Sequence, residues 1–147
     1  MKMLGRKVWI AIAAASICAS VTAADNLIVP GIRIGPISKA MGWANVKAIL
    51  GEPTSSIQLS KSGTTQHIFN GHGLSVRISD QSQRVRSVAA IDSRWKTAEG
   101  LRVGDSASKV RTTLGRPTED GGWHFWYPGL YFECPKPKGM VTGIVVD

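Results

Sequence analysis

The side chains that could perform catalysis are few and scattered along the chain. The histidines are His67, His72 and His124, and the cysteines are Cys18 and Cys134. No HxxxH, HExxH or CxxC spacing brings them together, so the sequence predicts neither a metal site nor a cofactor. The serines lack a nucleophile elbow, the glycines form no phosphate-binding loop, and the acidic residues are not paired. We therefore expect a protein that is not an enzyme and takes no small-molecule substrate.

Cys134 with a histidine is the one combination that resembles a nucleophile and its base. The dipeptide PG at 128–129 is a tight-turn signal, and alternation along the strand after it puts Cys134 beside Phe132 on the inward face. His124 then lies on the opposite face, so the two side chains cannot form a hydrogen bond. We expect Cys134 to be a small buried hydrophobe.

The stretch HFWYPGLYFE at 124–133 carries the strongest binding signal in the sequence. If Tyr127 faces Leu130 across the turn, alternation assigns the inward face to Trp123, Phe125, Tyr127, Leu130, Phe132 and Cys134. It gathers the candidate partner-binding residues on the outward face: His124, Trp126, Tyr131 and Glu133. Exposed Trp and Tyr are typical anchors of protein interfaces.

Two arrangements of these aromatic residues fit the sequence. Trp126 and Tyr131 either face solvent and bind a partner, or are covered by another part of the chain, with Trp95 as a candidate cover. Buried aromatic residues are the commoner case, which slightly favours the covered arrangement.

A similar hairpin is expected in the first half of the chain. Its loop is NGHG at 70–73, which pairs Phe69 with Leu74. The inward residues are then Phe69, Leu74, Val76 and Ile78, and the outward residues are Ile68, Ser75, Arg77 and Ser79. We include Ile68 and Arg77 among the candidate partner-binding residues.

The two hairpins belong to a longer internal repetition. VKAILGEPT at 46–54 matches VRTTLGRPT at 110–118, GIRIG at 31–35 matches GLRVG at 100–104, and GLSVRI at 73–78 matches GLYFEC at 129–134. The ends of the two stretches, VRSVAAID at 85–92 and MVTGIVVD at 140–147, also correspond. We predict an α+β protein of two tandem repeats, 25–92 and 93–147, each a helix followed by a three- or four-stranded antiparallel sheet. The short polar segment SRWKTAE at 93–99 is the expected linker.

LGxP marks the end of each predicted helix. Gly51 or Gly115 allows the left-handed turn that ends a helix, and Pro53 or Pro117 prevents the helix from resuming. The second helix starts at Asp105 or Ser106 and runs to Leu114, whereas the first is longer, about 38–50, with Gly42 as a possible break.

Residues 1–24 have the pattern of a signal peptide. Lys2, Arg6 and Lys7 precede an apolar run too short to span a bilayer, and small residues allow cleavage after Ala23 or Ala24. We expect a periplasmic protein, with secretion as the alternative. Membrane association requires a lipid on Cys18, for which the preceding Ile17 is a poor context.

Removal of the leader changes the charge and the cysteine count. Lys plus Arg falls from 18 to 15 against 10 acidic residues, which leaves +5. The charges form no basic run, so nucleic acid is not expected, and an acidic protein partner is favoured. Cys134 is then alone and cannot form an internal disulfide, although a disulfide between chains stays open.

The repeated pattern resembles the small exported module of the β-lactamase inhibitory protein and BamE families over nearly all of 31–147. The resemblance is carried by framework positions: Val46, Leu50, Gly51, Pro53, Val110, Leu114, Gly115 and Pro117. In the inhibitor family two such repeats form a concave surface that holds a folded enzyme through aromatic residues. The resemblance thus implies an inhibitor or immunity protein; the alternative is a BamE-like envelope-assembly or scaffold protein. The chain departs from the first family in lacking disulfides and from the second in its poor lipidation signal.

Overall fold

The computed structural model describes residues 26–135 and 139–147. The predicted signal peptide and Cys18 lie outside the described residues. The described part is an α+β structure with two helices, α1 (Trp43–Leu50) and α2 (Ala107–Leu114). Within that part, neither helix has the length and apolar character that crossing a membrane requires.

The strands form two sheets. The larger has eight strands in the order β4-β5-β6-β7-β12-β11-β10-β9, and the smaller has the order β3-β2-β1-β8. In the larger sheet the strands are β4 (Ser55–Leu59), β5 (Thr64–Phe69), β6 (Leu74–Ser79), β7 (Val85–Ala90), β9 (Glu119–Asp120), β10 (His124–Tyr127), β11 (Leu130–Glu133) and β12 (Gly143–Val146). In the smaller sheet they are β1 (Leu27–Val29), β2 (Arg33–Ile34), β3 (Ile37–Ser38) and β8 (Lys96–Thr97).

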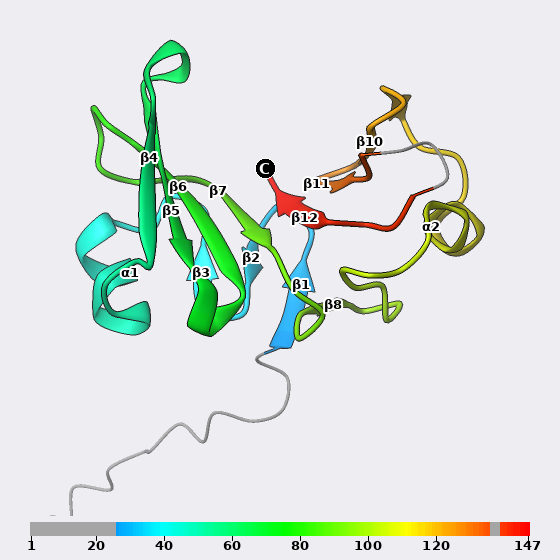
Figure 1. Cartoon of the computed structure of the whole chain (residues 1–147), viewed down its shortest axis with the longest axis horizontal. Coiled ribbons are helices and arrows are strands. Elements are labelled where there is room, and N and C mark those ends of the chain that lie inside the picture. Colours follow the sequence, from blue (N-terminus) through cyan, green and yellow to red (C-terminus); the bar gives the residue numbers. More distant parts are fainter. Residues whose placement is uncertain (1–25, 136–138) are drawn as a thin grey trace, which may run out of the picture.

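Four antiparallel strands follow each helix, and both sets belong to the same sheet. β7 and β12 join them, pairing Val88 with Val146 and Ala90 with Ile144. Figure 1 shows β7 and β12 at the centre, with α1 and α2 near opposite ends. The two halves therefore form a continuous sheet rather than two separate ones.

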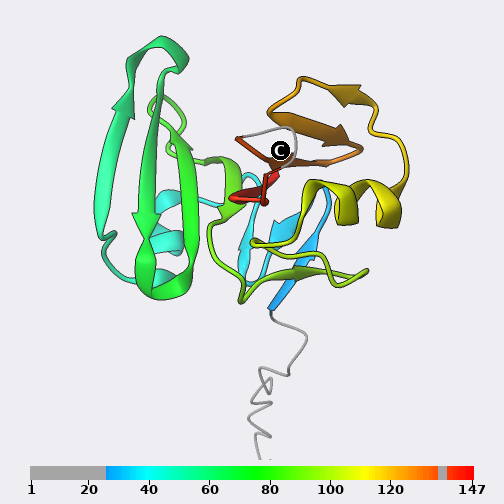
Figure 2. The ribbon, with the colours of Figure 1, turned by 45° about the vertical axis from the view of Figure 1, so that its right-hand side comes forward.

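The helices and the smaller sheet cover one face of the larger sheet. Figure 2 shows β1–β3, in blue, between the two helices and to the right of the long green strands. Side chains from all of these elements form a single core, whose largest fully buried members include Phe69, Phe125, Phe132, Ile28, Ile34 and Ile37. The opposite face carries neither helix, and we call it the free face.

Both helices end at the predicted LGxP corners, but the predicted left-handed helical conformation of the glycines is wrong. Gly51 and Gly115 have φ 79° with ψ −157° and −159°, and each donates its N–H to the carbonyl four residues earlier. That ψ lies outside the left-handed helical region and in a region that is essentially restricted to glycine. Pro53 and Pro117 follow two residues after these glycines. Each LGxP corner therefore ends its helix with a backbone conformation that asparagine could not readily adopt.

The predicted longer first helix is wrong. α1 has eight residues, the same length as α2, because Ile37–Ser38 form β3 and Ala40 has φ 63°. Gly42 is extended, pairs with Arg84 in an isolated bridge, and immediately precedes the helix. Ser106 occupies the same position before α2, where its side chain accepts from the Lys109 N–H and its backbone bridges to Met140.

The inward pattern of both hairpins is largely confirmed, with Trp123 as the exception. Phe69 pairs with Leu74 and Tyr127 with Leu130, as predicted, and Cys134 is fully buried. Trp123 is 61% exposed and precedes β10 at a point where Gly122 turns the chain with φ 77°. Alternation predicts the side of the sheet, but burial also requires other residues to cover that side.

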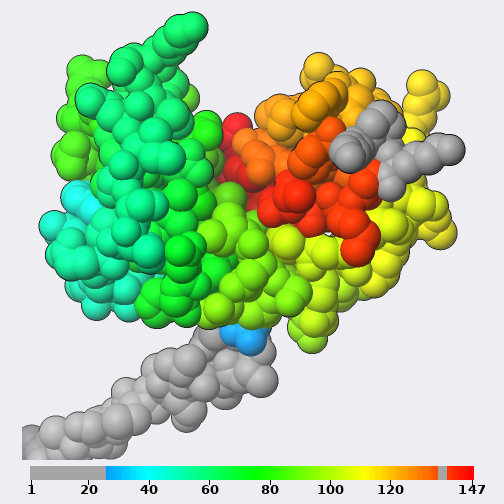
Figure 3. Space-filling model, in the orientation of Figure 1, coloured from blue at the N-terminus to red at the C-terminus, as the bar shows by residue number. Residues whose placement is uncertain are grey.

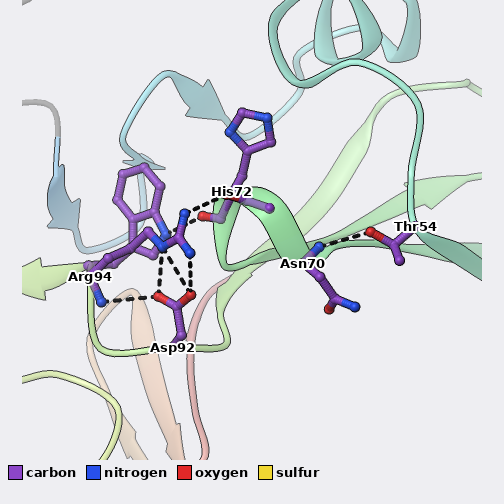
Figure 4. Close-up of polar contacts among 7 residues, drawn as sticks. Thr54, Asn70, His72, Asp92 and Arg94 are labelled. Atoms are coloured by element: carbon purple, nitrogen blue, oxygen red, sulfur yellow. Dashed lines mark hydrogen bonds and ion pairs between the residues drawn. The ribbon is translucent and has the colours of Figure 1, made fainter.

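The predicted linker is part of the folded structure. Trp95 is only 6% exposed and donates its Nε1–H to the His72 carbonyl at 2.8 Å, and Thr97 pairs with Ile28 in the smaller sheet. Arg94 binds Asp92 and the Gly71 carbonyl, which ties the segment to the turn between β5 and β6 (Figure 4). The junction between the halves is therefore packed against the first half.

Candidate functional site

One row of side chains crosses the free face from edge to edge. The strand registers place one residue of each strand in this central row, in the order Ser55, Ile68, Ser75, Ala89, Val145, Tyr131, Trp126 and Glu119. Small residues occupy its middle, and the larger Ile68, Tyr131 and Trp126 flank them. The side chains in the middle of the row therefore project less far from the sheet than those on its two sides.

All six predicted partner-binding residues lie on the free face. Ile68, Tyr131 and Trp126 belong to the central row itself. Arg77 is two residues beyond Ser75, while Glu133 and His124 are a cross-strand pair next to Tyr131 and Trp126. Residues more than 50 positions apart in the sequence therefore meet on one surface, because β7 pairs with β12.

The aromatic residues of this face contact one another. The Trp126 and Tyr131 rings have centroids 4.2 Å apart, and the His124 and Tyr131 rings lie edge to face at 5.8 Å. Trp126 is 36% exposed, and Tyr131 and His124 are half-buried. Trp95 belongs to the core on the other side of the sheet, so the sequence-based idea that it covers these rings is wrong.

A small hollow of about 60 Å³ lies beside the middle of the row. Its walls include Arg77 and Ser87 from the first half and Tyr131 and Glu133 from the second half. Figure 3 shows a notch between the lobe of residues 55–80, in green, and that of residues 120–135, in orange. Gln66 and Ser87 also line this hollow and are not among the predicted binding residues, although alternation along β5 to β7 assigns both to the outward face.

The charges near this hollow are not neutralised by direct pairing. The Nε–H of Arg77 is buried with no hydrogen-bond partner, and no ion pair within the described ranges includes Arg77 or Glu133. The strand registers place the two residues on opposite sides of the central row, which keeps them apart. A buried N–H without a partner is costly, so a ligand oxygen that reached it would be stabilised.

Glycine makes room for the Glu133 carboxylate. A Cβ on Gly143, the residue opposite Glu133, would lie 2.5 Å from its Oε2 atom. Any larger residue at 143 would displace the carboxylate from the sheet.

The environment of Tyr131 disfavours its phenolate form. Burial raises the pKa of Tyr131 above its ordinary value of 10.0, the negative charges of Glu133 and Asp147 raise it further, and the positive charge of Arg77 lowers it. The hydroxyl is therefore a hydrogen-bond donor at neutral pH.

The histidines and Cys134 are dispersed over the structure. His67 stacks on Trp43 with ring centroids 4.0 Å apart, and its Nδ1 lies 2.7 Å from the Ser56 hydroxyl. Burial lowers the pKa of His67 below 6.5. The Cys134 thiol donates to the Gly139 carbonyl inside the core, away from His124. Among residues 26–135 and 139–147, no cluster of three His, Cys, Asp or Glu side chains could hold a metal.

A larger hollow of about 460 Å³ borders the end of α2. It is lined by Arg111, Arg116 and Asp120 with the intervening GRPT corner. Arg111 is engaged already, with Asp120 at 2.5 Å and its guanidinium carbon 4.4 Å from the Phe125 ring centroid. The free face, where a buried N–H lacks a partner, is the stronger candidate site.

Neither a protein-family model, nor a curated protein, nor a solved structure matches this chain.

Proposed function

We propose that this protein is a non-catalytic protein-binding module that holds its partner on the free face of the eight-stranded sheet. The observation that carries the proposal is the convergence of Arg77, from the first half of the chain, and Tyr131, from the second half, around one small hollow. The Trp126 ring lies beside Tyr131 on the same face, with ring centroids 4.2 Å apart. Trp, Tyr and Arg are the residues most enriched among the dominant contacts of protein interfaces. Small residues in the middle of the row leave space for a side chain of the partner.

The free face favours an acidic partner. Arg77 has a buried N–H without a partner, Tyr131 offers a hydroxyl donor, and the chain without its predicted leader carries +5. A carboxylate of the partner could accept hydrogen bonds from both donors. The negative charge of Glu133, on the other side of the central row, would repel a second acidic group of the partner that extended toward it. An inhibitor of an acidic enzyme, or an immunity protein against an acidic toxin, fits this surface.

The proposal includes a repeated architecture of two copies of one unit. Each copy consists of an eight-residue helix ended by Gly-x-Pro and four antiparallel strands. Support comes from corresponding backbone bonds: Val85 N–H to Met41 carbonyl in one half and Val141 N–H to Asp105 carbonyl in the other, both at 2.8 Å. Thr54 and Thr118 likewise donate at 2.7 Å to Ile68 and Trp126. Such a duplication explains how one sheet acquires two sets of outward side chains on either side of β7 and β12.

Capture experiments with paired tryptophan variants test the proposal. The protein would be immobilised and exposed to envelope extract and to secretions of competing bacteria. We expect a stoichiometric protein partner that is lost with Trp126→Ala or Arg77→Met and retained with Trp123→Ala. Trp123 is the matched control because it is more exposed than Trp126 but belongs neither to the central row nor to the walls of the small hollow. If no partner is recovered, or if Trp123→Ala reduces capture as much as Trp126→Ala, the free face is not the binding surface.

The alternative function is a BamE-like scaffold at the outer membrane, which depends on a lipid on Cys18. Metabolic labelling with a fatty acid, compared between the wild type and Cys18→Ser, distinguishes the two. Label that is lost with the substitution would favour the scaffold; an unlabelled periplasmic protein would favour the inhibitor or immunity protein.

A further inference from the structure

The two edges of the eight-stranded sheet differ in how they are protected. At one edge, β9 has only two residues, both acidic, and Asp120 binds Arg111 and the Gly122 N–H. At the other edge, β4 reads SSIQL, five residues without charge or proline (Figure 2). Edge strands of soluble proteins are normally protected by brevity, charge, proline or a bulge. β9 is protected in two of these ways and β4 in none.

β4 is also a regular strand. It pairs with β5 at all five positions from Ser55 to Leu59 without a register shift. Its outer side therefore presents alternating backbone N–H and C=O groups in a straight row. Ile57, at its middle, is 50% exposed although isoleucine favours burial. Both the backbone and this side chain would gain from another strand beside β4.

We propose that β4 pairs antiparallel with β4 of a second copy of this chain, around a two-fold axis that passes through Ile57. An axis perpendicular to the sheet keeps both free faces on the same side, because residues directly opposite each other point to the same face. This arrangement places Ile57 opposite Ile57, Ser55 opposite Leu59 and Ser56 opposite Gln58. All five residues of each strand are paired.

The charges at the ends of β4 favour a second copy in this orientation. Glu52 precedes the strand and Lys61 follows it; both are exposed, and no ion pair in the described part of the chain includes either. An antiparallel pair brings the Lys61 end of one copy to the Glu52 end of the other, whereas a parallel pair would bring like charges together. A contact built on one five-residue edge is small, so we expect a weak dimer that forms as concentration rises.

Sedimentation measurements over a range of concentrations up to the millimolar range test this dimer. The wild type is expected to approach the mass of two chains, and Ile57→Lys to stay at the mass of one, because two ammonium groups would oppose each other at the axis. Ile49→Lys is the matched control, since Ile49 is similarly exposed at 45% but lies on α1. Circular dichroism verifies that both variants are folded.

Disulfide trapping tests the register independently. In a Cys18→Ser background, Ile57→Cys is expected to form a covalent dimer on mild oxidation, because directly opposite residues of antiparallel strands lie within disulfide reach. Ile49→Cys is expected to remain monomeric, and Cys134 is buried in the core. A wild type that stays monomeric throughout, equal dissociation by both lysine variants, or no cross-linking of Ile57→Cys would each overturn the proposal. Capture of a different chain through β4 by a monomeric protein would also overturn it.

Discussion

At the scale of single residues, two oppositely charged side chains of the free face act on Tyr131. Glu133 and Arg77 act on Tyr131 with opposite sign, and neither neutralises the other by direct contact. Each therefore stays available to a partner, and Tyr131 reports on both. This makes the tyrosine a convenient probe of the site in the absence of a known ligand.

Replacing the charged neighbours of Tyr131 should move its pKa in opposite directions. We expect Glu133→Gln to lower the raised pKa of Tyr131, because it removes a negative charge that disfavours the phenolate. Arg77→Met should raise it, because it removes the opposing positive charge. NMR titration of ring-labelled tyrosine measures both changes, and Tyr127, in a different environment, is the internal control. Shifts in the same direction for both variants would contradict this assignment.

At the scale of elements, the two helix ends depend on an unusual glycine conformation. Gly51 and Gly115 combine φ 79° with ψ near −158°, while Gly63, in a hairpin turn, has φ 61° and ψ 36°. Nothing lies within 4 Å of a Cβ placed on any of the three. Differences among their substitutions would therefore reflect backbone conformation rather than clashes.

Asparagine substitution distinguishes the two kinds of glycine. We expect Gly115→Asn and Gly51→Asn each to lower the free energy of unfolding by about 1–3 kcal/mol, because that region of φ and ψ is essentially closed to other residues. Gly63→Asn should cost less, because asparagine tolerates the left-handed helical region. Urea unfolding followed by circular dichroism measures the three values, and equal costs would contradict the argument.

At the scale of the whole molecule, the halves are held together by more than the central strand pair. Gly31, near the start of the first half, donates its N–H to the carbonyl of Gly129 in the β10–β11 turn at 2.6 Å. A Cβ on Gly129 would lie 2.6 Å from the Gly31 nitrogen, a distance that real contacts do not show. Because of this close approach and the shared core, we expect the described structure to unfold as one cooperative unit.

Gly129→Ala should accordingly destabilise both halves together. We expect a larger loss in the free energy of unfolding than for Gly63→Ala, which has the cost of positive φ without the clash. Unfolding would be followed in Trp43→Phe and Trp126→Phe backgrounds, so that the remaining fluorescence weights different halves. Coincident transitions shifted by the same amount support one unit, and a shift in one half alone would contradict it.

The sequence by itself determined the local features of this protein. Glycine and proline restrict backbone angles, which sets the helix ends, and the two-residue period of a strand assigns Tyr131 and Trp126 to one face and Phe125 and Phe132 to the other. These inferences need only neighbours in the chain. They failed at Trp123 and at the start of α1, where burial and a bridge to distant Arg84 decide the outcome.

Only the tertiary structure decided which local surfaces meet. The pairing of β7 with β12 joins Ile68 and Arg77 to the aromatic residues across one sheet. The burial of Trp95 in the core excludes it as a cover for those aromatic residues. The hollow beside Arg77 and the glycine contact between Gly31 and Gly129 likewise join residues far apart in the chain. Such contacts follow from the packing of the whole core, because backbone preference and alternation do not specify which distant strand a given strand will pair with.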